Sequence, residues 1–397
     1  MFTEILVATL LGIIAGTFTG LVPGIHVNLV AVMLLSISAK LLGIAGVESI
    51  ACFIISMSIT HSFVSTIPSI FLGAPEPSSA LSVLPGHRLF LEGKGLEAVK
   101  LTIIGSLFGL IISFIFYYFF EQIINIIYPI ASKHIPELLL IAGIFIISRT
   151  DKKGKALFTY VTAGILGVMV LNSRIENPLF PLLSGLFGCS TLIFSLKEKS
   201  VMPEQKLTKK TELNIKTGIK NSMLGAASGF ITAILPGLGS STAAGIASIF
   251  SKESDAKNFL IMMGSITTVN FFMSIAALSV LGKARNGAVI VVKELWQVPE
   301  TSLLIAAAMI SGGISVFSAK KCAEKFLKIM KKIKYESVVK IVLSLITIMT
   351  YILSGYLGLL ILVVSTILGL YVNIVGIPRN TMMACIMVPV MTFFLTI

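Results

Sequence analysis

Charged residues are scarce in this sequence. Asp, Glu, Lys and Arg make up 12% of the 397 residues, whereas apolar residues make up 55% and the mean hydropathy is +0.98. Soluble domains carry about 25% charged residues, so a water-soluble domain of this length is excluded. Several apolar stretches reach the roughly 20 residues that cross a bilayer, and the longest polar stretch, 197–220, is too short to bury a core. The composition predicts an all-α, polytopic membrane protein.

The sequence also lacks the usual signatures of metal sites and enzymes. Its four cysteines, Cys52, Cys189, Cys322 and Cys385, show neither CxxC spacing nor a matching histidine pattern. HExxH, GxSxG and the Walker GxxxxGK[ST] loop are absent. The net charge of +13 comes from short loops between apolar spans, without the interleaved aromatic residues of a nucleic-acid surface. We therefore expect no enzyme activity, no catalytic residue, no metal or cofactor, and no nucleic-acid partner.

Apolar runs divide the chain into two halves with the same order of parts. Each half begins with an apolar stretch broken by Pro-Gly and continues with five apolar spans. The predicted first membrane repeat is 1–196, followed by a cytoplasmic linker at 197–220 and a second repeat at 221–397. The first half has a broken pair at 3–38 and spans at 49–72, 96–120, 136–149, 156–172 and 178–195. The second half has a broken pair at 221–251 and spans at 258–282, 300–319, 336–353, 355–374 and 380–396.

Two pairs of similar segments support this duplication. GTFTGLVPGIHVN around Pro23 resembles GFITAILPGLGSS around Pro236, at an offset of 213 residues. SITHSFVSTIPS from Ser58 resembles SITTVNFFMSIA from Ser265, at an offset of 207 residues. Two matches in the same order, with nearly the same offset, indicate an internal repeat.

The distribution of Lys and Arg predicts the orientation. Five spans are an odd number, and a broken pair returns to its own side whether it is re-entrant or crosses twice, so the second repeat is inverted. With loops 84–95, 150–155, 196–220 and 320–335 in the cytoplasm, 25 of the 31 basic residues lie inside, Arg379 among them. The N-terminus lacks the basic region and cleavage site of a signal peptide. We expect a multi-pass protein of the cell membrane with both termini outside.

The two Pro-Gly breaks are the strongest indication of a binding site. Each break leaves backbone groups that hydrocarbon cannot satisfy, and the helix after it presents N–H groups and a positive dipole end that suit a carboxylate or phosphate. Close packing by small residues is the alternative, but matched breaks in two halves favour the midplane site of a transporter. The substrate-binding residues predicted at the two tips are Pro23, Gly24, His26 and Asn28, and Pro236, Gly237, Gly239, Ser240, Ser241 and Thr242.

Polar side chains inside the next apolar spans form a second set of candidates. Hydroxyls in membrane helices usually bond to their own backbone, whereas His61 and Asn270 need partners that lipid cannot give. The set comprises Ser58, Thr60 and His61 in the first half and Ser265, Thr267 and Asn270 in the second. Glu76 is the best acidic candidate for ion coupling, with a solvated loop carboxylate as the alternative. The coupling ion is expected to be Na⁺ held by oxygens or a proton on His26 or His61.

Four segments together resemble the TctA family, the large membrane subunit of tripartite tricarboxylate transporters. They are GLVPGIHVN, GFITAILPGLGSS, IFLGAPEPSSALSVLPGHRLFLEGKGLEA and PLLSGLFGCSTLIF, spread over most of the chain. The resemblance implies ion-coupled uptake of citrate-like or other carboxylates. It also implies an extracytoplasmic binding protein and a small membrane subunit as partners, besides the organic anion and membrane lipid. PGIHVN and VLGKARNGAV depart from the family pattern, so no particular substrate carries over.

Two other functions are compatible with paired Pro-Gly segments. Polyprenyl-phosphate translocases also pair two Pro-Gly and Ser-rich hairpins, and PGLGSS suits a phosphate as well as a carboxylate. Such a lipid substrate needs a lateral opening between helices. A membrane scaffold without transport is the third interpretation, in which the hairpins only pack. Ion-coupled, alternating-access transport of a di- or tricarboxylate is the leading hypothesis.

Overall fold

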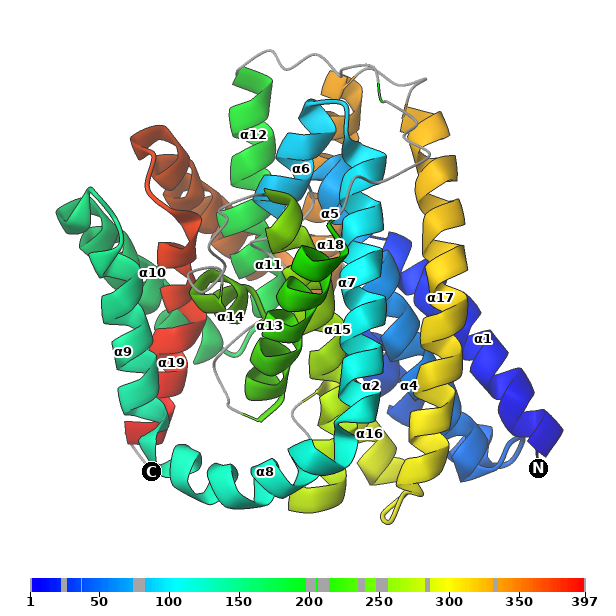
Figure 1. Ribbon diagram of the computed structural model, residues 1–397. Helices are drawn as coiled ribbons and strands as arrows, with labels where there is room; N and C mark the ends of the chain where they lie inside the picture. The colour runs from blue at the N-terminus through cyan, green and yellow to red at the C-terminus, as the bar shows by residue number, and fades with distance from the viewer. Residues whose placement is uncertain are drawn as a thin grey trace.

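The computed structural model describes a helical protein over residues 2–22, 27–36, 38–73, 83–197, 205, 214–234, 240–247, 256–282, 286–330 and 335–395 (Figure 1). These residues contain no strand, which confirms the all-α prediction. The helices before residue 198 are α1 (Phe2–Leu21), α2 (Val27–Ser36), α3 (Ser38–Leu42), α4 (Val47–Val64), α5 (Thr66–Leu72), α6 (Val83–Leu91), α7 (Gly95–Ile115), α8 (Tyr117–Ala131), η2 (Ser132–His134), α9 (Ile135–Ser148), α10 (Lys153–Leu171), α11 (Leu179–Leu183), η3 (Ser184–Cys189) and α12 (Ser190–Lys197). The later helices are α13 (Ile215–Ile234), α14 (Ser240–Ala247), α15 (Ala256–Leu281), α16 (Gly287–Leu295), α17 (Thr301–Met330), α18 (Tyr335–Val375), η4 (Arg379–Met383) and α19 (Ala384–Leu395).

Among the described residues, seven helical stretches are long and apolar enough to cross a membrane. They are Phe2–Leu21, Val47–Leu72, Gly95–Ile115, Lys153–Leu171, Ala256–Leu281, Thr301–Ile329 and Val339–Val375. An eighth is added if α8 and α9 count as one bent span. The chain is therefore a polytopic membrane protein.

Helix α18 contains two of the predicted spans in one run. Its 41 residues would be about 60 Å long if straight, roughly twice the thickness of the hydrocarbon core. Gly355 in its middle has φ 63° and ψ −164°, a conformation that glycine adopts much more readily than other residues. The predicted boundary between 336–353 and 355–374 therefore falls at a break inside α18.

Helix α8 is an element that the sequence pattern did not predict. The pattern predicts a span at 96–120, but α7 ends at Ile115 and α8 lies across the lower end of the molecule (Figure 1). The axes of α8 and α9 differ by 95°. Phe119, Ile126 and Ile130 are exposed, whereas the Glu121 carboxylate accepts a hydrogen bond from Ser279 of α15. Exposed apolar side chains on a helix that lies across the others are typical of the membrane–water interface.

The buried apolar side chains form two main clusters. The larger one is built around α4, α7, α13, α15, α16 and α17. The second is built from α9, α10, η3, η4 and α19, which lie to the left in Figure 1 where they are labelled, and α18 contributes to both. The candidate residues on α4 and α15 belong to the larger cluster.

Two segments predicted as cytoplasmic loops are helical. Helix α6 occupies most of the predicted loop 84–95, and α17 continues to Met330 inside the predicted loop 320–335. The prediction of a loop was wrong in both segments for one reason, and their cytoplasmic side stays a prediction. The Lys and Arg of these segments were read as marks of a loop, but long basic side chains also fit the end of a helix that leaves the membrane.

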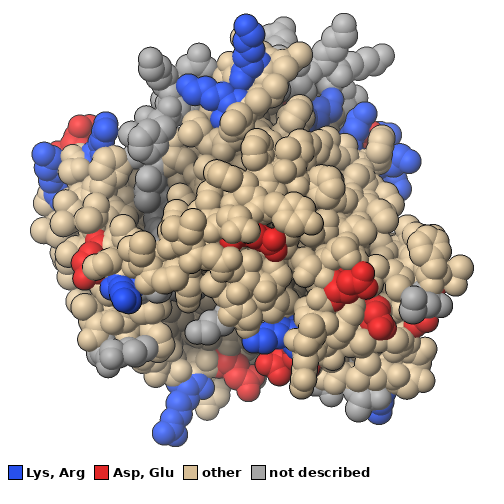
Figure 2. Space-filling view, turned by 60° about the horizontal axis from the view of Figure 1, so that its bottom comes forward, with Lys and Arg blue, Asp and Glu red and all other residues tan. Residues whose placement is uncertain are grey.

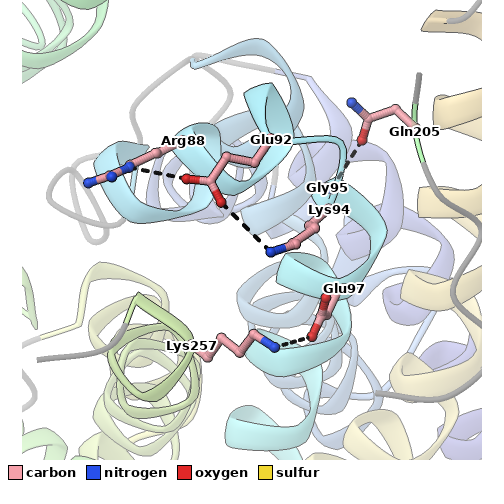
Figure 3. Close-up of polar contacts among 7 residues, drawn as sticks. All are labelled: Arg88, Glu92, Lys94, Gly95, Glu97, Gln205 and Lys257. Carbon is pink, nitrogen blue, oxygen red and sulfur yellow. Dashed lines mark hydrogen bonds and ion pairs between the residues drawn. The ribbon is translucent and has the colours of Figure 1, made fainter. Parts of the chain in front are cut away.

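Part of the predicted linker is docked on the helices that precede it. Gln205 is 3% exposed, and its side-chain oxygen accepts from the Gly95 amide at 3.1 Å while its amide nitrogen donates to the Phe90 carbonyl at 2.7 Å. Figure 3 shows this contact beside the ion pair of Lys257 with Glu97, at 2.7 Å, which joins the start of α15 to the start of α7. The two halves are thus tied together at this end of the molecule.

Both chain ends lie at the lower end of Figure 1. Figure 2 turns this end forward and shows acidic and basic residues scattered over it, with wide uncharged areas between them. Extended uncharged surface is expected of a protein surrounded by lipid.

Candidate functional site

The long helices α4 and α15 each pack along the helix that precedes a Pro-Gly break. Helix α1 lies against α4, and α13 lies against α15. We call these two pairs the first crossing and the second crossing. In the spans that contain α4 and α15, 94% and 89% of the most apolar stretch is buried, against at most 56% in the other spans. The long helices α4 and α15 therefore occupy the centre of the molecule, whereas α1 lies at its edge (Figure 1).

Glycines let the helices of each crossing touch backbone to backbone. A Cβ on Gly16 would lie 2.4 Å from the Met57 carbonyl oxygen, and a Cβ on Gly229 would lie 2.8 Å from the Ile266 carbonyl oxygen. The contacts one turn earlier are those of Gly12 with Phe53 and of Gly225 with Met262. Any larger residue would push the helices apart, so small residues are required at these positions.

The glycine contacts fix which residues of the two halves are equivalent. Gly16 and Gly229 differ by 213 positions, as the prolines do, but their partners Met57 and Ile266 differ by 209. The sequence pairing of Ser58 with Ser265, offset 207, is therefore wrong by two residues. The sequence SIT occurs in both halves and suggested the pairing of Ser58 with Ser265. Packing, however, constrains the residues that face the glycines, and these are paired differently. In the corrected register Asn270 corresponds to His61.

A threonine one turn before each proline bonds to these equivalent residues. Thr19 Oγ1 lies 3.0 Å from His61 Nδ1, and Asn270 Nδ2 donates to Thr232 Oγ1 at 2.8 Å. Thr19 and Thr232 are also 213 positions apart. The two crossings therefore hold the same polar contact, and both His61 and Asn270 find partners inside the protein.

The bonding pattern favours one tautomer of His61. If the hydroxyl proton of Thr19 goes to the Gly16 carbonyl at 3.2 Å, Nδ1 of His61 donates to Thr19 Oγ1, whereas the opposite direction requires the other tautomer. Thr232 donates to the Gly229 carbonyl at 2.9 Å and accepts from Asn270. With Nδ1 as the donor, each crossing has a nitrogen donor at this position, a ring N–H in one and an amide N–H in the other.

For two of the predicted hydroxyls, the hydrogen bonds seen among the described residues stay within their own helix. Ser58 donates to the Ile54 carbonyl at 2.7 Å, and Thr267 donates to the Met263 carbonyl at 2.9 Å. Such bonds are typical of hydroxyls that serve the helix itself. The geometry gives Ser58 and Thr267 no contact with the rest of the candidate site.

The other two predicted hydroxyls join helices. Thr60 accepts a hydrogen bond from Ser315 of α17 at 2.9 Å. Ser265 donates to the Ser222 carbonyl of α13 at 2.8 Å. Each long helix is thereby tied to a neighbouring span by a buried hydroxyl.

Sequence reasoning did not predict how the hydroxyls at the centre of the two long helices are paired. Ser62 of α4 and Thr268 of α15 lie 3.1 Å apart, and Ser65 fills the turn between α4 and α5 with a buried hydroxyl that has no partner among the described residues. Gly20, near the end of α1, lies against the Ser65 backbone. The cluster of hydroxyls from 58 to 66 was the available signal. It does not reveal which hydroxyl lacks a partner.

The residues at the two predicted tips lie mostly outside the described residues. This holds for Pro23, Gly24, His26, Pro236, Gly237 and Gly239, and for Glu76. Asn28 lies in α2, and Ser241 and Thr242 lie in α14, with side chains outside the described part. Ser240 begins α14 and is 5% exposed. The described residues of α1 end at Leu21 and those of α13 at Ile234, and α2 and α14 are described from Val27 and Ser240, with each Pro-Gly in the part outside the description.

Within the same described ranges, no three His, Cys, Asp or Glu side chains are grouped as they would be around a metal ion.

Comparison with known proteins identifies a family. The sequence model of the tripartite tricarboxylate transporter TctA family matches residues 6–384. Uncharacterized protein MJ1079 of Methanocaldococcus jannaschii is 28% identical over 395 residues, which cover 97% of this chain and 98% of that protein. No solved structure matches.

Proposed function

The chain belongs to the tripartite tricarboxylate transporter TctA family, and on that premise we propose that it carries a di- or tricarboxylate across the membrane by ion-coupled alternating access. This family is a component of a transporter and not an enzyme. The seven spans make this chain a multi-pass membrane component of such a system. The family name also supports two partners, a binding protein and a small membrane subunit.

The matched contacts of Thr19 with His61 and of Thr232 with Asn270 carry the proposal. Each contact fixes the end of a helix one turn before a Pro-Gly. A helix fixed in this way sets the position of the tip that follows. Substrate oxygens accept hydrogen bonds from amide and hydroxyl groups at 24–28 and 237–242, which face one another near the midplane.

The two halves act as inverted repeats in this proposal, 1–196 and 221–397, with 197–220 in the cytoplasm and both termini outside. The repeated glycine contacts of the two crossings support the duplication. The excess of Lys and Arg in the predicted cytoplasmic segments supports the orientation, and it stays large when the buried Arg379 is left out of the count. Inverted repeats give two related packings of one binding site, as alternating access requires.

Either Na⁺ or a proton is the coupling ion. The unpartnered hydroxyl of Ser65, beside the end of α1, supports Na⁺ because this ion is held by oxygens. The buried imidazole of His61 supports a proton because an imidazole nitrogen can take up and release one. Uptake driven by a sodium gradient alone, compared with uptake driven by a pH gradient alone, separates the two.

Reconstitution into liposomes tests the proposal. The purified protein should accumulate labelled citrate or succinate under one of these gradients, alone or with the two partner subunits added. Ser241→Leu and Gly237→Leu should abolish uptake because they fill a tip. Gly313→Ala is the matched control, since a Cβ there meets no atom within 4 Å, and it should transport as the wild type does.

Other outcomes identify the alternative functions. An absence of uptake across a broad carboxylate panel, together with binding of a polyprenyl phosphate, would identify a lipid-carrier translocase. Tip variants that lower the unfolding temperature but leave uptake unchanged would identify hairpins that only pack, as in a scaffold.

A further inference from the structure

Arg379 is a buried cation with a neutral partner. The residue is 8% exposed, and its Nη1 donates to Thr191 Oγ1 at 2.5 Å. Within the part of the chain that the structure describes, no Asp or Glu oxygen lies within 4 Å of the guanidinium. Glu97, the buried carboxylate of that part, pairs with Lys257 at 2.7 Å. The sequence analysis counted Arg379 among the cytoplasmic flanking charges, and its burial shows that this interpretation was wrong.

The position of Arg379 links it to the second Pro-Gly break. The residue begins η4, the turn between α18 and α19, and η4 contacts α14, the helix that follows this break. Its partner Thr191 lies on α12, directly after the π-helical turn η3, and π-helical turns occur frequently at functional sites. The turn that begins with Arg379 therefore packs against the helix that follows the second Pro-Gly break.

The charge of Arg379 also acts on the larger cluster. His87 of α6 is 3% exposed, and burial lowers its pKa to about 4, against the raising influence of its bond to the Ile70 carbonyl. The positive charge of Arg379 contributes to this lowering of the His87 pKa. His87 is thus neutral near pH 7 and does not compete with Arg379 for an anion.

The chemistry of a guanidinium indicates what this position binds. It carries five N–H donors in a rigid fork, and Thr191 accepts from one nitrogen. Removing a cation from water is costly unless an anion accompanies it. The fork matches both oxygens of a carboxylate, and ionisable residues at membrane depth commonly mark a substrate path. Asn380, the next residue, adds a buried side-chain oxygen without a partner among the described residues, which suits a substrate hydroxyl.

From this juxtaposition we infer that Arg379 recognises the substrate by binding one of its carboxylate groups beside α14. The inference rests on the proposed transport of carboxylates and names the residue that selects for negative charge. Thr191 holds the guanidinium in place and leaves its other donors for the substrate.

Uptake of labelled succinate and citrate by Arg379→Gln, Arg379→Lys and the wild type tests the inference. Competition by succinate and by succinamate, which has an amide in place of one carboxylate, measures the selection for charge. Arg379→Gln should raise KM about 10- to 100-fold, the range for hydrogen bonds to a charged group, and should lose the preference for succinate over succinamate. Arg379→Lys should keep part of that preference. Arg149→Gln, at an exposed arginine over the Phe145 ring, is the control and should change neither value.

The outcomes separate this inference from the proposed function. A wild type that neither transports these anions nor is stabilised by them against heat contradicts the proposed function, and the inference with it. A wild type that transports them, beside an Arg379→Gln protein with the same KM and the same selectivity, contradicts the inference alone. If Arg379→Gln lowers Vmax and unfolding temperature while KM and the stabilisation by succinate stay unchanged, the residue is structural and the inference fails.

Discussion

The first and second crossings share a glycine contact, a threonine and a buried long helix, but they differ in the residue that bonds to the threonine. His61 holds this position in the first crossing and Asn270 in the second. Both can present an N–H to a threonine oxygen. The hydrogen bond is thus common to the two crossings, whereas the ability to change charge belongs to the first alone.

The crossings also differ in how tightly they are packed. A Cβ added to Gly16 would lie 2.4 Å from the carbonyl oxygen of the facing helix, whereas a Cβ added to Gly229 would lie 2.8 Å from the corresponding oxygen. His61 is 2% exposed, whereas Asn270 is only partly buried. The first crossing is therefore the more closely packed of the two. In alternating access, a looser crossing is the one that rearranges at lower cost.

The largest expected effect comes from adding a methyl group at the glycines. Gly16→Ala and Gly229→Ala should both destabilise the protein, by about 1–3 kcal/mol, because overpacking shifts two backbones. Gly16→Ala should cost more, since its Cβ would lie 2.4 Å from a carbonyl oxygen, against 2.8 Å at Gly229. Thermal unfolding of the purified variants in one detergent measures the order.

Gly313→Ala controls for the effect of alanine in a membrane helix. It should be neutral or slightly stabilising, because no atom lies within 4 Å and alanine favours the helix. Equal losses at Gly16 and Gly229 would show that the crossings are equally tight and would remove the second difference between them.

A smaller effect is expected when the shared hydrogen bond is removed. Thr19→Val deprives the fully buried ring of His61 of an acceptor and should cost about 1–2 kcal/mol. Thr232→Val should cost less, because the partly buried Asn270 amide has access to other partners. Unfolding temperatures measured side by side test this order, and a larger loss at Thr232 would contradict it.

Much of the fold was predictable because membrane insertion depends on composition and length. Apolar runs located the span Val47–Leu72 and the helices α15 and α10 to within a few residues. The break inside α18 was also predicted, because Gly355 separates two apolar runs. Helix α8 was missed because its apolar residues could equally have extended the preceding span. Its direction depends on tertiary contacts such as that of Ser279 with Glu121.

The candidate site was predictable by residue type but not by pairing. His61 and Asn270 were singled out because lipid cannot satisfy them, and each has a partner in the structure. The equivalence of His61 and Asn270 was not predicted, since it follows from the glycine contacts and not from sequence similarity between the two halves. Arg379 was taken for a flanking charge because a single basic residue beside Pro378 looks the same in a loop and in a buried turn.

The smallest effect on stability, and the most informative on mechanism, is expected from exchanging the residue that differs. The side-chain nitrogen of asparagine can occupy the place of histidine Nδ1, so His61→Asn should keep the bond to Thr19 and change stability by less than about 1 kcal/mol. If His61 carries the coupled proton, uptake by this variant should no longer depend on pH between about 5.5 and 7.5. Asn270→His places a titratable ring in the second crossing.

The single and double exchanges decide what the difference between the crossings means. If the proton site only needs a ring in either crossing, the double variant His61→Asn with Asn270→His restores the dependence on pH, measured as initial uptake at a fixed gradient. If the first crossing is required, the double variant stays insensitive. His134→Asn, at an exposed histidine beside Glu137, controls for surface titration and should leave the profile unchanged. A wild-type pH profile in His61→Asn would show that the proton is not carried by His61, and would leave a proton on His26 or Na⁺ as the coupling ion.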